Sequence, residues 1–68
     1  MTVEEKKANY EILWQTESKE WTIIDRHMGI EPIVVCWYFD ENTYSWASGH
    51  YFTSKDAAMK WLYTEKIK

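Results

Sequence analysis

Cysteine, glycine and proline are scarce in this chain of 68 residues, which has one cysteine, two glycines and one proline. The single cysteine, Cys36, excludes an internal disulfide framework, and no Cys/His spacing typical of a metal site is present. The two glycines, Gly29 and Gly49, do not form a glycine-rich loop of the kind that holds phosphate groups. The sequence therefore predicts neither a metal ion nor a cofactor.

Long apolar runs are also absent. No run approaches the roughly 18–20 residues that a helix needs to span a bilayer. The opening residues, MTVEEKKANY, do not resemble an apolar signal sequence. Together with the lone cysteine, these features predict a soluble protein of the reducing cytoplasm, without a membrane partner.

Basic residues are missing from the middle of the chain. No Lys or Arg lies between Arg26 and Lys55, whereas Glu31, Asp40 and Glu41 do, and the net charge is −3. A nucleic-acid-binding surface normally carries a basic stripe, so this distribution disfavours phosphate-backbone binding. The net charge is also too small for a mimic of DNA.

Aromatic residues, in contrast, are abundant: five Trp, five Tyr and two Phe. A short chain buries little of its surface, and large aromatic side chains compensate for this. Two tryptophan pairs bracket polar stretches, Trp14-QTESKE-Trp21 and Trp37-YFDENTYS-Trp46. If each segment folds back about its polar centre, each pair meets across two antiparallel strands.

The N-terminal half predicts a polar arm and one hairpin. Residues 1–8 form the arm, in which Thr2 and Glu5 match a capping box, so a short helical turn and a frayed arm are both open. Residues 9–27 alternate as strands do. Folding about residues 17–18 pairs Trp14 with Trp21, Ile12 with Ile23, and Leu13 with Thr22. An amphipathic helix over about residues 2–15 is the second interpretation.

The C-terminal half predicts a second hairpin over residues 33–52 and a helix over residues 54–66. The run at 33–39 is apolar throughout, which is typical of a strand covered on both faces. A turn at 40–43 would pair Trp37 with Trp46, and Gly49 would mark a bulge or close packing. The same fold pairs Phe39 with Tyr44, Val35 with Ser48, and Cys36 with Ala47. Thr53 or Ser54 would cap the helix, whose apolar face contains Ala57, Ala58, Trp61 and Leu62.

The resulting prediction is a single α+β domain: a four-stranded antiparallel sheet from two hairpins, with one C-terminal helix on one face. One helix covers only one face. The larger apolar set of the second hairpin is expected under the helix: Ile33, Val35, Trp37, Phe39, Tyr44, Trp46 and Phe52. The smaller set is then left uncovered, as an interaction surface, a dimer interface or tyrosines shielding backbone: Val34, Cys36, Tyr38, Ala47 and Tyr51.

Catalytic chemistry has little support in the sequence. Asp25 and His27 form the nearest approach to an acid–base or metal pair, but surface residues at a strand end are the simpler interpretation. Cys36 lies among apolar neighbours that block access and raise a thiol pKa, so we expect a structural role. Ser45 and Ser48 lack a nucleophile-elbow context. We expect no enzyme.

The function that these residues favour is binding of another protein, since Trp and Tyr are frequent in binding hot spots and acidic residues steer basic partners. A small bacterial or phage accessory protein, acting as an inhibitor of a host or defence enzyme, is the expected kind of protein. The alternatives are a homodimer that binds a small ligand and single-stranded nucleic-acid binding through the aromatic sheet face. The expected partner-binding residues are Tyr38, Asp40, Glu41, Tyr44 and Tyr51.

Overall fold

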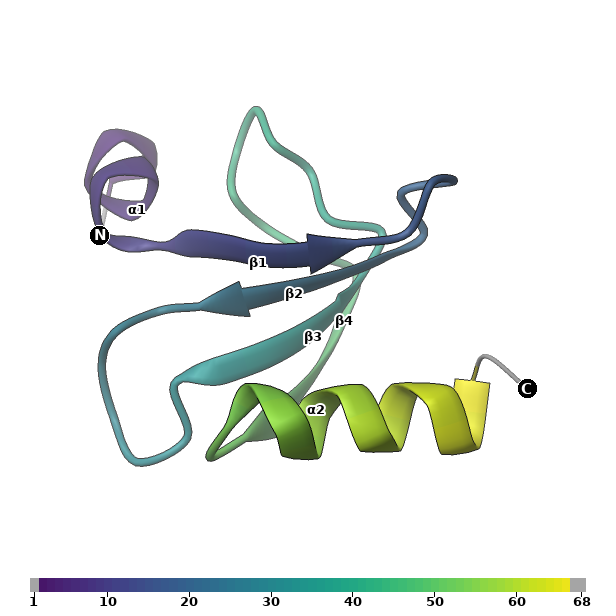
Figure 1. Ribbon diagram of the computed structural model, residues 1–68. Helices are drawn as coiled ribbons and strands as arrows, with labels where there is room; N and C mark the ends of the chain where they lie inside the picture. The colour runs from purple at the N-terminus through teal and green to yellow at the C-terminus, as the bar shows by residue number, and fades with distance from the viewer. Residues whose placement is uncertain (1, 67–68) are drawn as a thin grey trace.

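A computed structural model describes residues 2–66 and has a four-stranded antiparallel sheet at its centre (Figure 1). The strands are β1 (Glu11–Gln15), β2 (Trp21–Asp25), β3 (Ile33–Trp37) and β4 (Ser48–Phe52), and they lie in the sheet in sequence order. The helix α2 (Lys55–Trp61) follows β4 and continues into a π-helical turn, η1 (Leu62–Lys66). The predicted α+β architecture is confirmed.

The N-terminal arm forms a short helix, α1 (Val3–Asn9), and the capping box is present. The Glu5 amide donates to the Thr2 hydroxyl and the Thr2 amide donates to the Glu5 carboxylate, each at 3.1 Å. These bonds hold the pKa of Glu5 below its ordinary value, chiefly through the bond from the Thr2 backbone. No residue of α1 is buried, so the cap rather than packing supports this helix. The longer amphipathic helix over residues 2–15 is not formed.

The register of the first hairpin differs from the prediction. Trp14 lies opposite Ile23, not Trp21, and Ile12 lies opposite Ile24, with a bulge between Ile12 and Trp14. The turn is longer than expected because Thr16 closes it: its hydroxyl accepts the Trp21 amide at 3.1 Å. Residues 17–20 then form the loop, in which Lys19 has φ +64°.

The second hairpin is also displaced, by two residues. Trp37 lies opposite Ser48 on one side and Trp21 on the other, so the predicted Trp37–Trp46 pair does not form. The strand ends at Trp37 because Tyr38 takes φ +54°, which turns the chain out of the sheet. Residues 38–47 become a loop rather than two strand ends. Two other predicted pairs fail with it, since Val35 lies opposite His50 and Cys36 opposite Gly49. Phe39 and Tyr44 do not pair across strands either, because the isolated bridge joins Asp40 and Ser45, although the rings of Phe39 and Tyr44 pack with centroids 5.1 Å apart.

The loop 38–47 covers the sheet face that was predicted from the sequence to be uncovered. Figure 1 shows it on the opposite side of the sheet from α2. Phe39, Tyr44 and Trp46 pack there with Tyr10 against Ile24, Val34 and Cys36. The prediction that these three aromatic residues lie under the helix is therefore wrong, as is the prediction of an uncovered face. The backbone reversal at Tyr38, followed by a second positive φ of +53° at Tyr44, accompanies the move of all three to the other layer.

The helix side holds the other half of the core. Ala58 and Leu62 pack on Ile23, Ile33 and Val35, and all five side chains are buried. Trp61 lies against Trp21, Phe52 and His50. The predicted pairing, in contrast, implied contacts of Trp61 with Trp37 and Trp46. Ser54 caps α2 by accepting the Ala57 amide at 3.2 Å.

Candidate functional site

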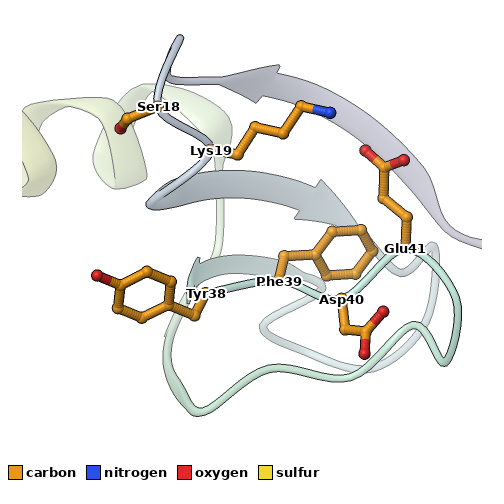
Figure 2. Close-up of a pocket in the computed structure, with 6 residues that line it drawn as sticks. All are labelled: Ser18, Lys19, Tyr38, Phe39, Asp40 and Glu41. Carbon is orange, nitrogen blue, oxygen red and sulfur yellow. The ribbon is translucent and has the colours of Figure 1, made fainter.

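A notch of about 390 Å³ opens at the end of the sheet where the turn of the first hairpin meets the start of loop 38–47. Figure 2 shows its side chains: two come from the turn and four from the loop. The amide of Tyr38 donates to the carbonyl oxygen of Glu20 at 2.9 Å, which ties the two segments together. The notch is lined by Ser18, Lys19, Tyr38, Phe39, Asp40 and Glu41.

The backbone at the notch is held in an unusual conformation. Lys19 and Tyr38, one from each segment, both have positive φ. For a bulky residue such as Tyr this conformation costs on the order of 1–2 kcal/mol, and such outliers gather at functional sites. The strained Tyr38 is 57% exposed, so the reversal places a large aromatic side chain in solvent. Phe39, the next residue, is buried and forms the floor.

The notch is acidic overall. Residues 17–20 and 38–41 carry Glu17, Glu20, Asp40 and Glu41 against Lys19 alone. Within residues 2–66, Lys19 forms no ion pair with these carboxylates. Figure 2 shows the Lys19 and Glu41 side chains reaching along the same side of the notch. Asp40 has a structural task as well, since its carboxylate accepts the Asn42 amide at 2.8 Å.

Three of the five predicted binding residues meet in the notch: Tyr38, Asp40 and Glu41. Tyr44 does not, because its ring packs edge-on against Phe39 in the covered core, with centroids 5.1 Å apart. Tyr51 lies on β4, where the Arg26 guanidinium stacks 4.8 Å from its ring centroid.

The lining residues Ser18 and Lys19 are not among the predicted binding residues, because they come from the other hairpin. Only the pairing of Trp21 with Trp37 brings them to Tyr38. Trp37 itself flanks the notch: its ring centroid lies 4.6 Å from that of Tyr38, and its indole N–H donates to Glu20 at 3.2 Å.

The candidate catalytic residues lie apart from the notch. His27 is exposed, with Nε2 3.2 Å from Glu11 and Nδ1 3.5 Å from Asp25. Cys36 is fully buried, and burial raises the pKa of its thiol to about 12. The predicted structural environment of Cys36 is thus confirmed. Across residues 2–66, no group of three or more His, Cys, Asp or Glu side chains could hold a metal ion.

None of the helices within residues 2–66 combines the length and the apolar character that spanning a bilayer requires. Comparison of the chain with protein-family models, curated proteins and solved structures finds no match.

Proposed function

We propose that this protein is a non-catalytic protein-binding module that docks a basic segment of its partner on the notch. The observation that carries the proposal is Tyr38: a bulky side chain in a strained conformation, exposed beside Asp40 and Glu41. Tyr is a frequent hot-spot residue because it contributes a large contact area at low entropic cost. An Arg or Lys of the partner can lie on the Tyr38 ring and pair with Glu41.

The surroundings of the notch support a partner of macromolecular size. Trp37 extends the aromatic surface beyond Tyr38, and Glu17 and Glu20 extend the acidic surface. A standard interface buries about 800 Å² on each partner, roughly one sixth of the 4486 Å² surface of this chain. Much of this end of the molecule would then be covered. In this proposal the protein acts in the cytoplasm as a small bacterial or phage accessory protein that inhibits an enzyme by covering a basic surface.

The homodimer alternative depends on a bare sheet face. Because loop 38–47 covers that face, we do not propose it. The nucleic-acid alternative needs cations around exposed aromatic residues, and the notch has an excess of carboxylates.

Site-specific photo-crosslinking tests the proposal. Tyr38 is replaced by a photoreactive phenylalanine derivative, and Tyr63, which is 50% exposed on η1, is replaced as the matched control. In lysate of the source cells, position 38 is expected to give one dominant adduct with a different protein, and position 63 none. The complex is then reconstituted from this protein and the purified partner.

Charge variants complete the test. Glu41→Gln is expected to slow association with the purified partner, and more so at low salt, because it removes a steering charge. Glu31→Gln, at the opposite end of the sheet, is the control and leaves the rate unchanged. The proposal fails if position 38 crosslinks only to copies of this chain, or if Glu41→Gln and Glu31→Gln behave alike.

A further inference from the structure

A second cavity, of about 290 Å³, lies on the helix side of the sheet at the same end as the notch. Strand register explains its position: Trp21 lies opposite Trp37, and Trp37 lies opposite Ser48, so three adjacent strands supply lining residues at one level. The turn η1 passes this level and adds Lys66. The full lining is Trp21, Trp37, Ser48, His50 and Lys66.

The walls of this cavity are flat aromatic rings. The ring centroids of Trp21 and Trp37 lie 6.5 Å apart. The ring of Trp61 supports this arrangement. Its centroid lies 6.3 Å from that of Trp21, edge-on, and 4.4 Å from that of His50. Such surfaces bind planar ligands by offset stacking. The walls therefore favour a ligand with a flat aromatic body.

The polar groups of the cavity are suited to an anion. Lys66 is the one lining residue with a formal charge, and its ammonium lies 5.8 Å from the centroid of the Trp61 ring. Within residues 2–66, the Ser48 hydroxyl and the His50 ring nitrogens form no hydrogen bond, so both are available to a ligand. Two carboxylates adjoin lining residues in the sequence, and neither lines the cavity. Glu20, next to Trp21, is bonded to the Trp37 indole, and Glu65, next to Lys66, lines a different pocket beside Lys60 and Thr64.

We infer that this cavity binds a small planar anion: an aromatic or heteroaromatic carboxylate or phosphate. The ring stacks on Trp37 and Trp21, while the anionic group pairs with Lys66 and accepts a hydrogen bond from Ser48 or His50. The volume lies near the lower end of the roughly 300–1,000 Å³ range of small-molecule sites, so one ring and one anionic group fill it. This cavity shares no lining residue with the notch, although its wall residue Trp37 packs against Tyr38 of the notch. The inference does not depend on the proposed function.

Titrations followed by the indole N–H signals of isotope-labelled protein test the inference. Benzoate and phenyl phosphate are the anionic probes, and benzamide is the neutral one. Both anions are expected to shift the signals of Trp21, Trp37 and Trp61 at millimolar concentration, and to leave those of Trp14 and Trp46 in place. Tighter binding of phenyl phosphate or of benzoate identifies which anion the site prefers. Equal binding of benzamide and benzoate, or equal shifts at all five tryptophans, overturns the inference.

A variant separates charge from stacking. Lys66→Met keeps the length of the side chain and removes its charge. It is expected to weaken benzoate binding roughly fivefold, the upper end for an exposed ion pair, and to leave benzamide binding unchanged. Lys55→Met, in the first turn of α2 and outside the cavity, is the matched control. The inference is also overturned if Lys66→Met and Lys55→Met bind benzoate equally well.

Discussion

Gly49 on β4 and Trp46 in the loop are in close contact: a Cβ atom added to Gly49 would lie 2.6 Å from the indole nitrogen of Trp46. The same added atom would lie 3.3 Å from a Val34 methyl group. The close packing expected at Gly49 is thus confirmed, although its partner is a loop residue. The absence of a side chain at this position lets loop 38–47 lie flat on the sheet.

Gly49→Ala is therefore expected to destabilise the fold by about 1–3 kcal/mol, because the rigid indole must move away from the sheet. Chemical denaturation followed by tryptophan fluorescence measures this change. Ser48→Ala, one position earlier and exposed, is the control and should stay within about 0.5 kcal/mol of the parent. Equal stabilities for the two variants would contradict the packing described for the loop.

Tyr38 should separate stability from binding. Tyr38→Gly removes the steric penalty of positive φ, whereas Tyr38→Ala keeps it, so the glycine variant should be the more stable of the two by about 1 kcal/mol. Both variants lose the exposed ring and should lose partner capture equally. Denaturation curves measure the stability of the two variants. Binding measurements give their affinity for the partner that crosslinking identifies. A less stable glycine variant would show that the backbone at position 38 is not strained.

The buried thiol of Cys36 should make stability fall at alkaline pH. Its pKa is raised from 9.0 to about 12 in the folded chain, so between these values the unfolded chain loses the proton while the folded chain keeps it. The stabilisation is complete below the unfolded pKa and is lost as the pH rises toward the folded pKa. The stability difference between the parent and Cys36→Ala should therefore shrink as the pH rises from about 9 toward about 12. A constant difference would show that the thiol titrates normally in the folded chain.

The capping box should matter to α1 alone. Thr2→Ala removes the hydroxyl that accepts the Glu5 amide, so α1 is expected to fray, with faster amide hydrogen exchange in residues 3–9. Global stability should hardly change, because α1 buries no residue. The lowered pKa of Glu5 means that the cap is intact above its ordinary value of 4.5 and is lost as the pH falls through the lowered one. Loss of global stability in Thr2→Ala would contradict this separation.

The order of the strands and the place of α2 follow from the sequence, because alternation, caps and turn residues are local signals. The strand register does not follow from the sequence, because it depends on Tyr38 and Lys19 taking positive φ. The side chains of Tyr and Lys do not favour this conformation, so the sequence does not predict it. The apolar run 33–39 predicts one continuous strand, whereas β3 ends at Trp37. Once Tyr38 turns the chain, Phe39 and the aromatic residues after it move to the other core layer.

The site follows the same division. The pattern places Tyr38 on the uncovered sheet face, whereas in the structure it turns out of the sheet. Asp40 and Glu41 lie in the predicted turn 40–43, so their position at a hairpin tip was predictable. Lys19 was not, because it reaches them only through the lateral pairing of β2 with β3. The alternation of the second hairpin predicts Trp37 in the buried core, whereas it is 36% exposed beside both cavities.

The position of loop 38–47 over the sheet face opposite α2 builds the notch. Nuclear Overhauser contacts between aromatic rings test it directly. The structure predicts contacts from the Trp46 indole to Val34 and Phe39, and from the Trp37 ring to Trp21. Contacts between the rings of Trp37 and Trp46, with none from Trp46 to Val34, would contradict it, because they would mean that the second hairpin pairs its two tryptophans across the strands.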